Sequence, residues 1–276
     1  MADKKVKIKQ VKSTIGASEA QVKVVRALGL LLRVILSRLL GAELMGITEL
    51  AQSIHMLLIT PLTAGLPVAI SRMTARAPQN EKSHPLHAGI QLVRYASAIM
   101  IPTLWFLAPV LSRAMGDVRV LPSLWFSSPC ILILGYSAVY NGYCYGMECS
   151  QYPAISELIE QVLRLTLTIL LMRLFKHLST PWFAGLPVLA TGVAELIGLC
   201  YVIKSIYAAP CTVYESQKEQ IPLLKLALPS TVSRIIQTFF RSMMSIFIPH
   251  RLQASGLMAA EATAQLGMLN GMVMPV

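Results

Sequence analysis

The stretch VVRALGLLLRVILSRLLGAE, residues 24–43, has the length and apolar character of a membrane helix, yet it carries Arg26, Arg33 and Arg38. An arginine at the centre of such a helix costs about 2.5–3.5 kcal/mol on insertion scales, so it must face a cavity, a partner or a bound anion. Arg26 and Arg33 are seven residues apart and share one face, about 10 Å apart along the axis. Arg38 points elsewhere and can snorkel to the interface. Structural pairing of all three arginines is the alternative.

The composition of the 276-residue chain predicts an all-α, polytopic membrane protein. It is 55% hydrophobic and only 13% charged, whereas a soluble domain carries about 25% charged residues. The apolar residues fall in long runs, from which we expect a bundle of about 7–8 transmembrane helices. The net charge of +11 is explained by basic loops and buried arginines rather than by nucleic-acid binding.

Polar segments divide the chain into four predicted parts. Residues 1–21 form a lysine-rich cytoplasmic tail, residues 22–208 hold six helices, residues 209–221 form a cytoplasmic linker, and residues 222–276 hold helix seven and the start of an eighth. Lysine and arginine are more frequent in the short loops on the side of the amino terminus, which predicts a cytoplasmic amino terminus. The expected helices cover residues 22–41, 47–71, 88–111, 123–143, 154–175, 183–207 and 222–248.

The second predicted helix is interrupted at Pro61, Gly65 and Pro67. Proline lacks the backbone donor and clashes with the preceding turn. Within a membrane such a break is tolerated only where protein or a wet cavity satisfies the freed backbone groups. Thr60 and Thr63 are close enough in sequence for their hydroxyls to satisfy some of these backbone groups.

Helix seven repeats the pattern of the first helix. Ser230, Arg234, Gln237, Arg241 and Ser245 step by four, three, four and four residues, so they share one helix face. A polar stripe on an apolar helix faces a bundle interior or water. The alternative is a hydrogen-bonded contact between helices that involves no ligand.

Three further charges lie within predicted helices five and six. Glu160 and Arg164 are four residues apart, a spacing at which the two side chains can pair on one helix. Glu195 has no basic residue near it on its own helix. It therefore either binds a proton or a cation, or pairs with an arginine of another helix.

No enzyme motif is present. The sequence holds no HExxH, GxSxG or Walker pattern, and its cysteines and histidines show no metal-binding spacing and no disulfide framework. We therefore expect a protein that is not an enzyme, with no cofactor and no metal. Inward-facing arginines beside a broken helix suit a cavity for an anionic, phosphate-bearing substrate, because guanidinium binds phosphate bidentately.

Four blocks of sequence stand out: RALGLLLRVILSRLLGAE (26–43), GLPVAISRMTA (65–75), YNGYCYGMECSQYPAISELIEQVLR (140–164) and IPHRLQASGLMAAEATAQLGMLNGM (248–272). In this order they resemble the stage V sporulation protein B family of polysaccharide and lipid-carrier exporters. The first block also resembles, more loosely, the first helix of lipid II flippases, in which an arginine precedes a Leu-Gly pair as Arg26 does here.

The resemblance implies the fold of the multidrug/oligosaccharidyl-lipid/polysaccharide (MOP) exporters, in which two six-helix lobes surround a central cavity and work by alternating access. This chain would supply the amino-terminal lobe and the start of the second. The implied activity is translocation of an undecaprenyl-diphosphate-linked saccharide such as lipid II, for spore-cortex or cell-wall peptidoglycan. The expected location is the bacterial plasma membrane or a membrane surrounding the forespore. Arg26, Arg33 and Arg241 would contact the diphosphate, with Arg234 second in line.

Two other functions stay open. A cation-coupled drug exporter of the same superfamily would use H+ or Na+ at an acidic residue such as Glu195. A non-transporting membrane scaffold is the alternative from a different functional class. It is considered because members of the family have twelve to fourteen helices, whereas this chain stops within the eighth.

Overall fold

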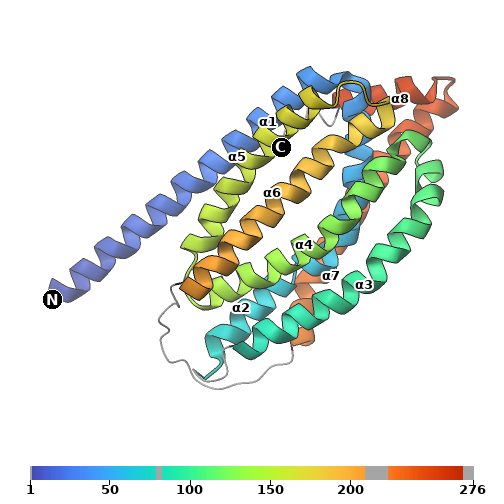
Figure 1. Ribbon diagram of the computed structural model, residues 1–276. Coiled ribbons are helices and arrows are strands. Elements are labelled where there is room, and N and C mark those ends of the chain that lie inside the picture. The colour runs from blue at the N-terminus through green and yellow to red at the C-terminus, as the bar shows by residue number, and fades with distance from the viewer. Residues whose placement is uncertain (1, 79–82, 209–222, 270–276) are drawn as a thin grey trace.

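The computed structural model describes the backbone of residues 2–78, 83–208 and 223–269, and the side chains of residues 23–78, 83–208 and 231–269. In that part of the chain every regular element is a helix, so the all-α class is confirmed (Figure 1). The elements are α1 (Ala2–Thr63), α2 (Leu66–Arg76), α3 (Ser83–Ala114), the 3-10 helix η2 (Val118–Val120), α4 (Leu121–Gly146), α5 (Gln151–Leu174), α6 (Thr180–Ala208), α7 (Leu223–Ala254) and α8 (Ala259–Leu266).

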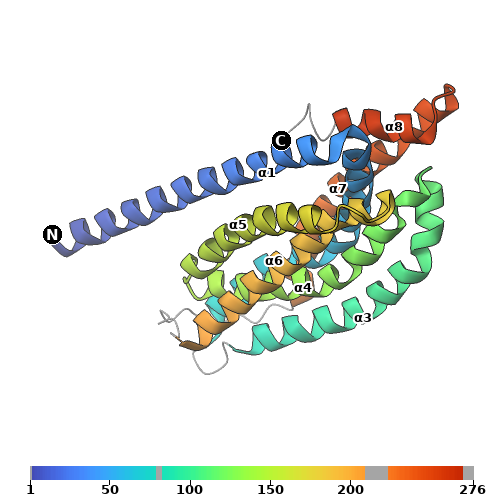
Figure 2. The same cartoon turned by 45° about the horizontal axis from the view of Figure 1, so that its top comes forward.

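Helix α1 consists of two halves that meet at Gly41. This residue has φ 71° and ψ 176°, a conformation that glycine adopts without a steric penalty. The first half projects from the bundle, and the second turns sharply down beside α4 and α7 (Figures 1 and 2). The backbone of the predicted tail is helical and continuous with α1, whereas the predicted linker at 209–221 lies outside the described residues.

The break predicted in the second helix falls between α1 and α2. Pro61 lies inside the last turn of α1, the helix ends at Thr63, and α2 begins after Gly65 with Pro67 in its first turn, where a missing backbone donor costs little. Thr60 donates to the carbonyl oxygen four residues before it at 2.5 Å, and Thr63 does the same at 3.0 Å. These hydroxyls satisfy carbonyl groups beside the break.

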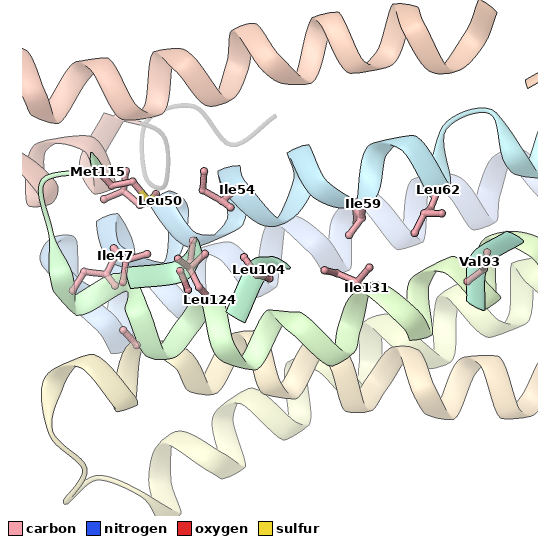
Figure 3. Packing of buried hydrophobic residues seen from close by; sticks show 14 of the residues in the cluster. Ile47, Leu50, Ile54, Ile59, Leu62, Val93, Leu104, Met115, Leu124 and Ile131 are labelled. Carbon is pink, nitrogen blue, oxygen red and sulfur yellow. The ribbon is translucent and has the colours of Figure 1, made fainter. Parts of the chain in front are cut away.

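The main hydrophobic core lies along the second half of α1. Ile47, Leu50 and Ile54 face Leu124 and Ile131 of α4, and side chains of α3 complete the cluster (Figure 3). Helices α4 and α6 also pack closely, as do α5 and α6. The core therefore fixes the second half of α1 against α3 and α4, while the other side of α1 stays available to line a cavity.

Glycines allow α2 to approach α4 closely. A β-carbon at Gly142 would lie 2.7 Å from backbone atoms of Pro67, and one at Gly146 would lie 2.6 Å from the carbonyl oxygen of Ser71. Two small residues four apart are a common contact motif between membrane helices. This contact holds the broken segment against α4.

Three helices of the described part are long and apolar enough to cross a membrane. They are α3, the η2–α4 segment Val118–Gly146, and α6. The sequence predicted about seven to eight spans, so this criterion supports the class of multi-pass membrane protein with a smaller number. The charged residues that line the cavity described below lie on two of the other long helices, α1 and α5.

Candidate anion-binding cavity

A cavity of about 860 Å³ lies between the two halves of α1 and helices α5 and α6. Its wall mixes apolar side chains with three arginines, one carboxylate and neutral polar groups. The polar lining residues are Arg26, Arg33, Thr48, Glu49, Gln52, Gln161, Arg164 and Thr191.

Arg26 and Arg33 both line this cavity, on the helix face that their spacing predicted. Arg33 donates from Nη2 to Glu49 Oε1 at 2.9 Å, and the two side chains are 27% and 18% exposed. Arg26 is exposed and makes no ion pair with a described residue. Arg38 is exposed and does not line the cavity. The positive charge of this wall is therefore only partly balanced by Glu49.

Among the described residues, the direct ion pair of Arg164 is not with Glu160, the partner that the sequence spacing suggested. Arg164 instead donates from Nη2 to Glu195 Oε1 of α6 at 3.0 Å. Of the two alternatives for Glu195, pairing with an arginine of another helix is the one that the structure contains. The sequence suggested the neighbour on the same helix because spacing reveals only local partners, whereas α5 and α6 pack along their lengths.

Glu160 is buried one turn from Arg164. Its Oε1 accepts a hydrogen bond from Ser156 at 2.6 Å. It packs against the bare backbone of Gly198, where a β-carbon would lie 2.1 Å from Glu160 Oε1. The interface of α5 and α6 thus holds two buried carboxylates, Glu160 and Glu195, beside one guanidinium.

The predicted polar stripe of α7 is divided in the structure. Arg234 and Arg241 are exposed and do not line the cavity. The hydroxyls beside them contact α1 instead: Ser242 donates to the carbonyl oxygen of Ser53 at 2.8 Å, and Thr60 donates to Thr238 at 3.2 Å. The hydrogen-bonded contact between α1 and α7 is therefore made by hydroxyls next to the predicted stripe rather than by the stripe itself.

An ion network that the sequence did not predict joins the α3–α4 connection to α1 and α8. Arg119 binds Glu43, which precedes the core segment of α1, and also Asp117 at 2.7 Å. Asp117 accepts a further hydrogen bond from Thr263 of α8 at 3.2 Å. Nearby, His250 Nε2 lies 2.7 Å from the carbonyl oxygen of Ala114. Separation in sequence hid this network, since Glu43 lies 76 residues from Arg119 and Thr263 lies 146 residues from Asp117.

Other polar groups of the cavity also escaped the sequence argument. Gln52, Gln161 and Thr191 face it from three helices, and only Gln161 had a signal, the face that it shares with Arg164. Within the described residues no cluster of ligands could hold a metal ion.

Comparison with known proteins identifies the family. The family model described as polysaccharide biosynthesis protein matches residues 19–276. The chain belongs to this family. Its members are transporters rather than enzymes, as the sequence predicted.

Among members of this polysaccharide biosynthesis family, stage V sporulation protein B of Bacillus subtilis (strain 168) is 28% identical over 265 residues. The match covers 91% of this chain and 51% of the relative, so the chain spans about half of the relative's length. The resemblance drawn from the four sequence blocks is confirmed.

A solved structure gives the fold. A multidrug resistance MATE family transporter of the MOP superfamily, in an inward-facing conformation, superposes with a TM-score of 0.64 at 15% identity. The match covers 92% of this chain and 60% of that transporter. At this identity the likeness establishes a shared MOP-type helical architecture and carries no information on substrate.

Proposed function

We propose that the chain is the amino-terminal portion of a flippase for undecaprenyl-diphosphate-linked saccharides, such as a lipid II-like peptidoglycan precursor used in spore-cortex or cell-wall synthesis. The observation that carries this proposal is the cavity of about 860 Å³ that is lined by Arg26, Arg33 and Arg164. A membrane protein retains such a cluster only where the charges meet counter-charges or an anion. Glu49 balances one of the three from inside the cavity.

The neutral part of the lining suits the rest of such a substrate. Gln52, Gln161 and Thr191 present amide and hydroxyl groups, which donate to and accept from sugar hydroxyls. Arg26 and Arg33 are the proposed diphosphate contacts. Arg241, with Arg234 second in line, remains a proposed contact from α7 in a state or assembly in which α7 also borders the substrate.

The proposed topology places the amino terminus in the cytoplasm and the Gly41 bend on the outer side. Helices α1, α5 and α7 would then cross the membrane together with the three apolar spans. The proposed partners are the lipid-linked saccharide and membrane lipids, with H+ or Na+ as a possible coupling ion. The membrane is the bacterial plasma membrane or one that surrounds the forespore.

A cation-coupled drug exporter has less support, because Glu195 is paired with Arg164 at 3.0 Å rather than open to a cation. A non-transporting scaffold would need no anion cavity, so the experiment below separates it from the flippase.

Complementation of a flippase-depleted bacterial strain tests the proposal. We expect a transporter that contains this chain together with a second lobe to restore growth, and Arg26→Ala or Arg33→Ala in it to abolish growth at unchanged membrane levels. Arg33→Lys should also impair growth, because lysine lacks the bidentate geometry of guanidinium. The matched control is Arg38→Ala, on the same helix but outside the cavity, which should grow normally. Normal growth of the Arg26 and Arg33 variants, or no rescue by the wild-type transporter, would overturn the proposal.

A further inference from the structure

Arg164 connects the cavity to a carboxylate behind it. Its side chain lines the cavity together with Gln161, one turn earlier on α5. Its Nη2 also donates to Glu195 Oε1 at 3.0 Å. Glu195 is buried and is not part of the cavity wall, although Thr191, one turn before it on α6, is. The side chain of Arg164 therefore lies between the cavity and the buried carboxylate of Glu195.

The guanidinium of Arg164 has unused donors. A guanidinium carries five N–H groups, and among the described residues Arg164 makes a hydrogen bond only to Glu195. Its Nε is buried and without a hydrogen-bond partner there. A buried donor left unsatisfied costs about 1–3 kcal/mol. An anion that enters the cavity would satisfy these donors, which gives it a reason to bind Arg164.

Glu195 depends on Arg164 for its counter-charge. From α5 it faces Arg164, the buried Glu160 and the exposed Glu157, and from α4 it faces the thiol of Cys130. Of these groups only Arg164 is cationic. A buried carboxylate whose cation is withdrawn favours its protonated form, because burial penalises the charge.

Within the described residues, the other elements packed against α6 supply no cation that could replace Arg164 beside Glu195. Helix α1 directs Arg26 and Arg33 into the cavity in front of Arg164, where Arg33 is paired with Glu49 and Arg26 is exposed. The 3-10 helix η2 contributes Arg119, which is bound to Asp117 and Glu43. Within the described residues, a loss of Arg164 therefore leaves Glu195 without a nearby cation.

We propose that Arg164 is a counter-ion shared between Glu195 and the substrate: the diphosphate draws the guanidinium into the cavity, and Glu195 binds one proton from the aqueous phase. The proton is released when the diphosphate leaves and the ion pair re-forms. This inference rests on the proposed function and deepens it. It makes Arg164 a further diphosphate-binding residue, and it couples substrate binding to proton binding within the first six helices.

Isothermal titration calorimetry of the purified chain in detergent tests the exchange. The probe is farnesyl diphosphate, a short isoprenyl diphosphate, titrated in two buffers of different ionisation enthalpy so that bound protons are counted. We expect the wild-type chain to take up about one more proton per ligand than Glu195→Gln, which should bind the probe at least as tightly. Arg164→Gln should lose about tenfold in affinity, the effect of one charged hydrogen bond, and should show no extra proton.

The controls separate the possible failures. Glu157→Gln, an exposed carboxylate on the same face of α5, should keep the wild-type proton count, and farnesol should not bind. If Glu195→Gln does not fold, as judged by size-exclusion elution, the proton count of Arg164→Gln is subtracted from that of the wild-type chain instead. Equal proton counts in the wild-type chain and in these variants would overturn the exchange while leaving the proposed function intact. No binding of farnesyl diphosphate by the wild-type chain would overturn the proposed function itself.

Discussion

Helices α1 and α7 carry the same arginine pattern and place it in different surroundings. Arg26 and Arg33 of α1 line a cavity whose opposite wall is formed by α5 and α6. Arg234 and Arg241 of α7, also seven residues apart, are exposed. The apolar residues next to them are exposed as well, among them Ile236, Phe240, Met244 and Phe247.

This difference shows what a seven-residue spacing determines. The spacing puts two side chains on one helix face, but a binding site also needs a second wall, which is a long-range property. For α1 that wall comes from Gln161, Arg164 and Thr191, more than a hundred residues away. For α7 the described part of the chain contributes no such wall, so the comparison predicts that the two arginine pairs behave differently in this chain.

The largest expected effect distinguishes the two arginine pairs directly. Arg33→Ala, combined with Glu49→Gln so that no carboxylate loses its partner, should weaken farnesyl diphosphate binding by about 10–100-fold, since a charged hydrogen bond contributes about 1.5–3 kcal/mol. Arg234→Ala should change the affinity by less than about twofold, because that side chain is exposed and outside the cavity. The dissociation constant measured by calorimetry in detergent checks both.

One result would contradict this ranking. Equal losses in the Arg33 and Arg234 variants would mean that α7 borders the ligand in solution. An unchanged affinity in the Glu49→Gln single variant is the control, because this substitution removes the carboxylate while Arg33 remains.

The next effect sharpens the comparison within α1, whose two halves both line the cavity and whose second half also contacts α8. A β-carbon at Gly46 would lie 1.9 Å from the carbonyl oxygen of Thr263 in α8. Gly46→Ala should therefore lower the free energy of unfolding by about 1–3 kcal/mol, the usual cost of overpacking. Thermal unfolding in detergent measures the change.

The matched control is Gly29→Ala, on the cavity side of α1, where nothing lies within 4 Å of the added carbon. That substitution should leave the stability unchanged or raise it by up to about 1 kcal/mol, since alanine is the better helix former. A Gly46→Ala variant as stable as Gly29→Ala would show that α8 does not pack against α1 as described.

These contacts also explain how far the sequence could lead. Arginines in an apolar run and the prolines of the predicted break are local signals, and they predicted a cavity-facing helix and the interruption, whereas the bend at Gly41 was found only in the structure. The partner of Arg164 is not local: Glu160 is four residues away, but Glu195 of α6 is the residue that lies 3.0 Å from it. Likewise Glu49 lies on the other half of α1 from Arg33, across the Gly41 bend, and no periodicity relates the two.

A smaller effect concerns the connection that ties α8 to the bundle. Asp117→Asn removes the charge that Arg119 binds at 2.7 Å, and it weakens the acceptor of Thr263. We expect a loss of about 1 kcal/mol in the free energy of unfolding, because Glu43 still binds the guanidinium. Glu261→Gln, an exposed position on α8, is the control and should stay within about 0.5 kcal/mol of wild type. Equal stabilities of the two variants would remove Asp117 from this role.

The smallest effect tests the side of α7 that does have a partner. Ser242 donates to the carbonyl oxygen of Ser53 across the α1–α7 contact at 2.8 Å, whereas Ser37 bonds only within its own helix, to the carbonyl oxygen of Val34. Hydrogen bonds between membrane helices contribute about 0.6 kcal/mol on average. Ser242→Ala should lose about that much in an unfolding titration, and Ser37→Ala should lose less. If the two variants are equally stable, the hydroxyls of α7 do not hold it against α1, and its exposed arginines would be free to approach a ligand by a rotation of the helix.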